Sequence, residues 1–246
     1  MALKKHIPNT ITSMNLLAGA MGVIFTFQHR PDIAFACMLA AAVFDFCDGL
    51  AARLLGAYSA IGKELDSLCD MVSFGLLPAL MLVETMQRLG GPSWSSYLPL
   101  FLAVMSALRL AKFNIDERQE TDFIGVATPT AAMISGALCC YVHATPGSFL
   151  AAWAEAPWFL PTLSVLLGVL LVSEIPMFGM KVKPGHKLLD AKRIVFLALS
   201  VAVLLAVVVS GKHLSLAVFA IFVIYILENL VIHDAAVLRK YARPGK

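Results

Sequence analysis

Residues 45–70 read DFCDGLAARLLGAYSAIGKELDSLCD, a stretch in which four aspartates stand among mostly apolar residues. Asp45 and Asp48 are three residues apart, and Asp66 and Asp70 are four apart, so each pair shares one face of a helix. A charged group in apolar surroundings is costly unless it has a partner. The stretch therefore predicts two helices joined by a short connection, with their carboxylates turned toward one another.

The chain around this hairpin is apolar throughout. It has 246 residues, of which 59% are hydrophobic and 14% are charged, less charge than a soluble domain of this length needs. Apolar runs of about 20 residues, enough to cross about 30 Å of hydrocarbon, recur along it. We predict an all-α, polytopic transmembrane helical bundle, one integral membrane domain over residues 1–246, with about eight spans at residues 8–28, 32–55, 60–86, 95–113, 126–144, 158–178, 193–210 and 214–232.

The positive charges predict the orientation of these spans. Of the 19 lysines and arginines, all but Arg30, Arg88 and Lys212 fall on the side that holds both termini. This asymmetry predicts a multi-pass protein of the cell membrane with both termini in the cytoplasm. Residues 145–157 are then the longest loop on the far side, with Trp153 and Trp158 at the interface.

The remaining composition excludes two other interpretations. Polar residues interrupt any apolar core in residues 1–20, so we expect no signal peptide there. The net charge is +3, and no lysine or arginine stripe is interleaved with aromatic residues, so we expect no nucleic-acid partner.

The four aspartates predict a metal site near the cytoplasmic surface. Asp48 and Asp66 lie at similar depth, about one or two helical turns from the connection between their spans. Converging carboxylates repel one another unless something neutralises them, and hard divalent cations such as Mg²⁺ prefer all-oxygen ligands. Two such ions would balance four aspartates and could polarise a phosphate diester or a pyrophosphate. A single aspartate could instead pair with Arg53 or Lys63 and have no further role.

Small residues accompany the aspartates on both helices. Gly49 follows Asp48, Ala52 lies about one turn beyond it, and Gly62 lies one turn before Asp66. Small side chains allow close helix packing or leave a slot for a flat ligand.

The whole pattern, Asp45-x₂-Asp48-Gly49-x₂-Ala52-Arg53-x₈-Gly62-x₃-Asp66-x₃-Asp70, resembles the signature of the CDP-alcohol phosphotransferase family. The resemblance implies two divalent cations, Mg²⁺ or Mn²⁺, held by Asp45, Asp48, Asp66 and Asp70. It also implies that Asp70 is the general base, that the CDP-lipid contacts Gly49, Ala52, Arg53 and Gly62, and that the protein is a homodimer.

A wider resemblance points to the bacterial and archaeal phosphatidylserine synthases. IPNTITSMNLLAG at 7–19 is similar to their PN-x₂-T-x₂-N segment, which makes Asn9, Thr12 and Asn15 candidate contacts to the CDP-lipid. The segments at 62–79, 107–115, 123–132 and 173–178 are also similar, although Lys112 and Glu174 stand where arginine is usual. The resemblance covers residues 7–180 and implies a six-helix core, which the last two spans extend.

This wider resemblance implies that CDP-diacylglycerol and L-serine react to give phosphatidylserine and CMP. A site for serine needs a cation for its carboxylate near the membrane surface, and Arg109, Lys112 and Asn114 could form it. Arg109 and Lys112 could instead be ordinary anchors on the cytoplasmic side.

Two alternatives remain open. The same fold could use glycerol 3-phosphate, choline or an inositol acceptor, and Lys181, Lys183 and Lys187 are a candidate cluster for a phosphorylated one. A cation transporter also places aspartates inside a membrane, but it more often has broken helices and inverted repeats, neither of which the sequence shows.

Overall fold

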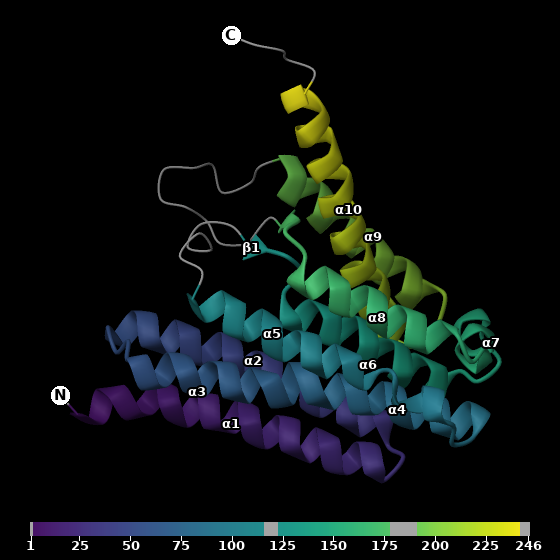
Figure 1. Ribbon diagram of the computed structural model, residues 1–246, viewed down its shortest axis with the longest axis horizontal. Helices are drawn as coiled ribbons and strands as arrows, with labels where there is room; N and C mark the ends of the chain where they lie inside the picture. Colours follow the sequence, from purple (N-terminus) through teal and green to yellow (C-terminus); the bar gives the residue numbers. More distant parts are fainter. Residues whose placement is uncertain (1, 116–122, 178–190, 242–246) are drawn as a thin grey trace.

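The computed structural model describes residues 2–115, 123–177 and 191–241, and these form a bundle of α-helices (Figure 1). The first three helical segments are α1 (Ala2–Phe27), α2 (Pro31–Leu55) and a continuous run of α3 (Ala60–Asp70), the π-helical η1 (Met71–Leu76) and α4 (Leu77–Gly90). A 3-10 turn, η2 (Trp94–Tyr97), follows. The remaining helices are α5 (Leu100–Ile115), α6 (Thr128–Ala144), α7 (Phe149–Glu155), α8 (Phe159–Val172), α9 (Ala191–Val209) and α10 (Ser215–Tyr241). The predicted all-α class is confirmed.

Helices occur at all eight predicted span positions, but they differ in length. By length and composition, four helices in the described ranges can cross a membrane, namely His6–Phe27, Pro31–Leu55, Ala60–Gly90 and Trp94–Ile115. The pair α7 and α8 is bent by 92° and adds a fifth if it forms one span. The chain is thus a multi-pass membrane protein, and the number eight stays a prediction.

Helix α6 lies at the centre of the bundle, in contact with α2, α4 and α10. All of its residues from Ala131 to Val142 are buried. Small residues allow this close packing, since a Cβ at Gly136 would lie 2.9 Å from Cδ2 of Phe35 on α2.

The end of α8 differs from the prediction. The helix ends at Val172 instead of residue 178, because Pro176 cannot donate a backbone hydrogen bond and disfavours helical geometry in the residue before it. Instead, β2 (Pro176–Met177) pairs with β1 (Phe123–Ile124) in antiparallel fashion. This short pair fixes the start of α6 beside the end of α8.

The predicted far-side loop at 145–157 is also more ordered than expected, because it contains α7. Ser148 caps this helix by accepting a hydrogen bond from the Ala151 N–H at 3.2 Å. The Trp153 ring lies 4.9 Å from that of Phe149 and 6.4 Å from that of Trp158. Both tryptophans are largely exposed, as the prediction of an interfacial aromatic group requires.

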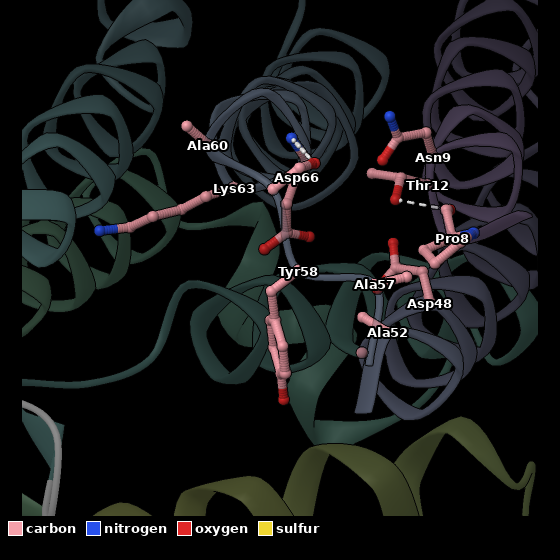
Figure 2. A pocket seen from close by; sticks show the side chains of 13 residues that line it. Pro8, Asn9, Thr12, Asp48, Ala52, Ala57, Tyr58, Ala60, Lys63 and Asp66 are labelled. Atoms are coloured by element: carbon pink, nitrogen blue, oxygen red, sulfur yellow. Dashed lines mark hydrogen bonds between the residues drawn. The ribbon is translucent and has the colours of Figure 1, made fainter. Parts of the chain in front are cut away.

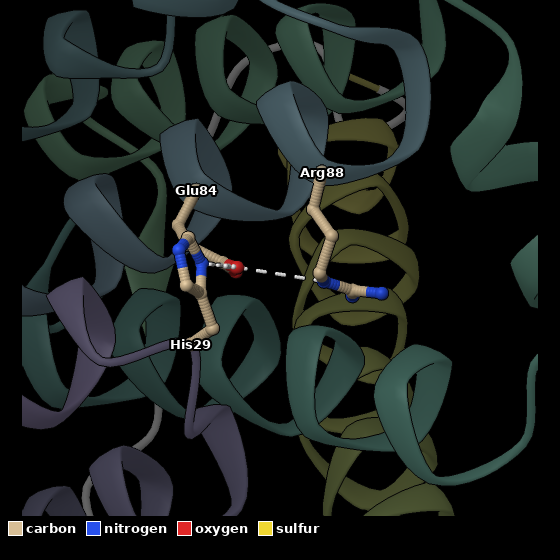
Figure 3. A network of polar contacts seen from close by, with 3 residues as sticks. All are labelled: His29, Glu84 and Arg88. Atoms are coloured by element: carbon tan, nitrogen blue, oxygen red, sulfur yellow. Dashed lines mark hydrogen bonds and ion pairs between the residues drawn. The ribbon is translucent and has the colours of Figure 1, made fainter.

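A polar network holds the α1–α2 turn against α4 at the end of the bundle away from residues 45–70 (Figure 3). Glu84 Oε1 lies 2.9 Å from His29 Nδ1 and 3.4 Å from Arg88 Nε. Glu84 is buried, and both partners contact Oε1, while Oε2 has no hydrogen-bond partner among the described residues. The network therefore fixes where α1 runs along the bundle.

We expect Gly125→Ala to destabilise the protein more than Gly211→Ala. Both glycines have positive φ, 79° and 62°, so each change costs about 1–2 kcal/mol in backbone strain. A Cβ at Gly125 would also lie 2.6 Å from the Leu171 carbonyl oxygen and 2.7 Å from that of Ser173, while no described atom lies within 4 Å of one at Gly211. Thermal unfolding in detergent measures the difference, and equal losses would contradict the described packing of Gly125.

Candidate active site

The α2–α3 hairpin brings three of the four predicted carboxylates together. The chain leaves α2 at Gly56, in left-handed geometry with φ 58°, and α3 begins after Ser59, whose hydroxyl accepts from the Gly62 N–H at 3.1 Å. Asp45, Asp48 and Asp66 each offer a carboxylate oxygen, and these oxygens lie within 4.8 Å of one another. The three residues are called the acidic cluster below.

The acidic cluster fits a divalent cation. Asp48 Oδ2 and Asp66 Oδ1 are buried and have no hydrogen-bond partner among the described residues. Unpaired buried carboxylate oxygens are costly, so their presence side by side indicates that a ligand completes the site. The donors are all oxygens, which suits Mg²⁺ or Mn²⁺.

Asp70 lies one helical turn beyond Asp66 on α3 and outside the acidic cluster as the described residues define it. It is buried, and its Oδ1 accepts a hydrogen bond from Asn15 Nδ2 at 3.0 Å. The π-helical η1 starts at the next residue, and such segments frequently occur at functional sites. Asp70 is thus outside the set of oxygens that lie within 4.8 Å of one another, but it is on the same helix as Asp66 and borders the same cavity as Asp45.

A cavity of about 560 Å³ opens beside the acidic cluster, and we call it the first cavity (Figure 2). Figure 2 shows the carboxylates of Asp48 and Asp66 turned into it, with the Thr12 hydroxyl facing Asp48. Its lining includes five of the predicted CDP-lipid contacts, namely Asn9, Thr12, Gly49, Ala52 and Gly62. These five residues therefore line one cavity, and their contact with a CDP-lipid stays a prediction.

Small residues keep the first cavity open. A Cβ at Gly62 would lie 3.0 Å from Ser59 Oγ and 3.1 Å from Asn9 Oδ1, so a side chain there would push against both. A Cβ at Gly49 would meet a single atom within 4 Å, Arg53 Nη2 at 4.0 Å, so it would project into open space. The slot between α1, α2 and α3 exists because these positions carry no side chain.

A second cavity of about 320 Å³ lies on the other side of Gly49, which lines both. Asp45 and Asp70 border this second cavity, and Arg53 lines it instead of the first. The other lining residues are Phe46, Leu110 and Phe113, together with Ala127, Thr128 and Pro129 of the segment 123–132 that resembles the synthases. The aspartates therefore stand between two cavities, two of them bordering each.

Of the three predicted serine contacts, the structure brings Arg109 to the second cavity. Arg109 is buried, its Nε donates to the Val126 carbonyl at 3.3 Å, and its guanidinium carbon lies 5.2 Å from the centre of the Phe113 ring. These contacts hold a cation in an apolar place next to Asp70.

Lys112 and Asn114 are placed differently, and neither lines the second cavity as described. Lys112 Nζ lies 3.7 Å from Glu174 Oε1, so the two residues that depart from the usual arginines pair with each other. Asn114 Nδ2 donates to Ser67 Oγ at 2.9 Å, and its carbonyl accepts from Lys63 Nζ at 2.8 Å. Both residues tie the end of α5 to its neighbours.

Comparisons with known proteins agree with this geometry. The sequence model of the CDP-alcohol phosphatidyltransferase family matches residues 5–172. The chain is 35% identical over 179 residues to the CDP-diacylglycerol–serine O-phosphatidyltransferase of Mycobacterium leprae, which covers 70% of this chain and 57% of that protein. The protein of the same name from Bacillus subtilis is 35% identical over 128 residues, which is 52% of this chain and 72% of that protein. The one from Methanocaldococcus jannaschii is 30% identical over 173 residues, which is 69% of this chain and 72% of that protein. The match thus spans less than two thirds of the mycobacterial proteins.

We expect Asp48→Asn to weaken Mn²⁺ binding about tenfold or more, because it removes a charged ligand from the acidic cluster. Electron paramagnetic resonance of the purified protein titrated with Mn²⁺ measures the dissociation constant. Asp32→Asn is the matched control, since Asp32 lies on the same helix and pairs with Arg30 at 2.9 Å in an exposed position. An unchanged Mn²⁺ affinity in the Asp48 variant would contradict the metal site.

Proposed function

Because this chain belongs to the CDP-alcohol phosphatidyltransferase family, we propose that it transfers the phosphatidyl group of CDP-diacylglycerol to L-serine and releases CMP. The observation that carries the proposal is the row of aspartates between two cavities, one lined by small residues and one by Arg109. A pyrophosphate placed there would face the cytidine on one side and the acceptor alcohol on the other. The names of the relatives support serine as the acceptor.

The first cavity is the proposed nucleotide site. Gly49, Ala52 and Gly62 leave a slot for the flat cytosine ring, and Asn9 and Thr12 offer polar atoms along the α1 side of it. Arg53 lines the second cavity, its Nε donates at 3.0 Å to the carbonyl of Gly49, which borders both cavities, and it is our candidate for a phosphate contact.

Asp45, Asp48, Asp66 and Asp70 are the proposed ligands of two divalent cations. When bound, such ions neutralise the pyrophosphate and stabilise the charge on departing CMP. The cluster holds the carboxylates in place before substrate enters, so little reorganisation is needed during the reaction.

Asp70 is the proposed general base. The serine hydroxyl oxygen attacks the phosphorus on the lipid side of the pyrophosphate, and its proton passes to the Asp70 carboxylate. The bond from this phosphorus to the bridging oxygen breaks, and CMP leaves with the electron pair. Asp70 lines the second cavity together with Arg109, which is where an acceptor would have to lie for this step.

Arg109 is the proposed partner of the serine carboxylate. A buried guanidinium can bind a carboxylate through two parallel hydrogen bonds, and Phe113 and Val126 hold this one in position. The sequence also favoured Lys112 and Asn114 as serine contacts. Both instead bind neighbouring segments, so in our proposal they hold the end of α5 in place and do not contact serine. The lysines that would suit a phosphorylated acceptor, Lys181, Lys183 and Lys187, lie outside the described residues.

The orientation in the membrane follows from the charge distribution. We propose that both termini and the active site face the cytoplasm of a cell whose inner or plasma membrane holds the protein. The lipid tails of the substrate can then stay in the bilayer while its nucleotide enters from the cytosol. The homodimer implied by the family resemblance is part of this proposal.

The direct test is CMP release by purified protein given CDP-diacylglycerol and one alcohol at a time: L-serine, glycerol 3-phosphate, choline or myo-inositol. We expect turnover with serine and none above background with the others. Excess chelator should abolish it, and Mg²⁺ or Mn²⁺ should restore it. Preference for another alcohol would refute the serine assignment, and full turnover in chelator would refute the metal requirement.

We expect Arg109→Ala to raise the KM for serine and to leave the apparent affinity for CDP-diacylglycerol nearly unchanged. Loss of a charge-assisted contact costs about 1.5–3 kcal/mol, or roughly a tenfold to hundredfold fall in kcat/KM. Arg109→Lys should restore part of it, because an ammonium cannot reproduce the bidentate geometry.

Lys112→Ala is the matched comparison, since it removes a cation from the same helix that pairs with Glu174. Its effect on the KM for serine should be several-fold smaller than that of Arg109→Ala. If Lys112→Ala raised this KM more than Arg109→Ala did, the serine carboxylate would bind at Lys112 instead.

A further inference from the structure

Asn15 contacts the proposed base instead of the nucleotide cavity. The sequence placed it with Asn9 and Thr12 as a contact to the CDP-lipid, and those two do line the first cavity, whereas Asn15 is absent from the described lining. Asn15 is fully buried, and its Nδ2 donates to Asp70 Oδ1 at 3.0 Å. The hydrogen bond described for its side chain thus goes to Asp70.

Two further contacts fix the position of α1, and so of Asn15, relative to η1 and Asp70. Ser73 Oγ, on η1 just after Asp70, donates to the Asn15 carbonyl at 3.1 Å. Gly19, one turn farther along α1, lies so close to η1 that a Cβ there would be 2.9 Å from Ser73 Cα. A glycine is therefore required at this contact, which prevents α1 from sliding relative to Asp70.

The hydrogen bond has a chemical consequence for Asp70. A carboxylate can only accept hydrogen bonds, and the amide N–H of Asn15 takes one lone pair of Oδ1. That restrains rotation of the carboxylate and leaves the other lone pairs of its two oxygens for a cation and for an acceptor hydroxyl. Asp70 borders the second cavity, so an acceptor there is within reach of this carboxylate. General-base catalysis needs hydrogen-bond reach, and displacement by about 1 Å can cost a hundredfold in rate.

We propose that Asn15 is a positioning residue for the base Asp70 and not a contact to the CDP-lipid, an inference that rests on the function proposed above. Asn9 and Thr12 bind the nucleotide end of the lipid from one turn of α1. Asn15, farther along the same helix, orients the group that takes the proton from the acceptor. One helix then holds the nucleotide and the base in a fixed relation.

The test compares four variants by steady-state kinetics and by direct binding of CDP-diacylglycerol. Asn15→Ala removes the donor, and Asn15→Asp keeps the size but places a second acceptor against Asp70. Asn9→Ala changes a residue of the first cavity. Thr10→Ala is the matched control on α1, because Thr10 is exposed and its hydroxyl donates to the His6 carbonyl of its own helix.

We expect Asn15→Ala to lower kcat about tenfold or more, with the KM and the dissociation constant for CDP-diacylglycerol within about twofold of wild type. Asn15→Asp should lower kcat further while it folds normally, as judged by size-exclusion chromatography. Asn9→Ala should instead raise the KM for CDP-diacylglycerol, and Thr10→Ala should match wild type.

Two results would overturn the inference. A raised KM for CDP-diacylglycerol at unchanged kcat in Asn15→Ala would make Asn15 a lipid contact. Wild-type kcat in a folded Asn15→Ala protein would show that Asp70 needs no such donor. A wild-type protein that binds CDP-diacylglycerol but releases no CMP with serine would refute the proposed function itself, and with it the role of Asp70 as a base.

Discussion

Carboxylates held within 4.8 Å of one another repel, and an apolar bundle leaves little water to weaken that repulsion. The α2–α3 hairpin maintains such an arrangement with Asp45, Asp48 and Asp66, two of which keep a buried oxygen unpaired. The surrounding structure has to supply the energy for this through packing elsewhere. The buried helix α6 supplies much of that packing, since small residues let α2, α4 and α10 approach it closely. A bound cation would turn this repulsion into attraction.

The position of α1 links the two ends of the molecule. At the far end, the buried Glu84 holds the turn after α1 through His29. At the site, Gly19 and Ser73 fix the same helix against η1. A helix held at its middle and just beyond its C-terminal end presents Asn9 and Thr12 to the first cavity and Asn15 to Asp70 with little freedom to slide. Preorganisation of this kind is what electrostatic stabilisation of a transition state requires.

The acceptor side depends on contacts from more distant parts of the chain. Ala127, Thr128 and Pro129 reach the second cavity because the β1–β2 pair and Gly125 set the start of α6 against the end of α8. Lys112 and Glu174 pair across the same junction. In this chain both residues depart from the usual arginines, and their opposite charges keep the junction together. The second cavity, our proposed acceptor site, is therefore shaped in part by a region that the aspartate signature does not include.

The sequence by itself determined the helical class, the acidic cluster and the α2–α3 side of the first cavity. These features depend on spacing within one helix or across one short connection, and helical periodicity turns such spacing directly into a shared face. Gly49, Ala52 and Gly62 line the cavity for that reason, whereas Asn9 and Thr12 of α1 were expected beside them from the family resemblance alone. The tertiary structure alone decided that Asp70 accepts a hydrogen bond from Asn15, that η1 is π-helical, that Arg53 lines the second cavity, and that Arg109 reaches it while Lys112 and Asn114 do not. Each of these outcomes depends on which side chains of other helices, often more than fifty residues away along the chain, pack against the residue in question, and local periodicity carries no information about that choice.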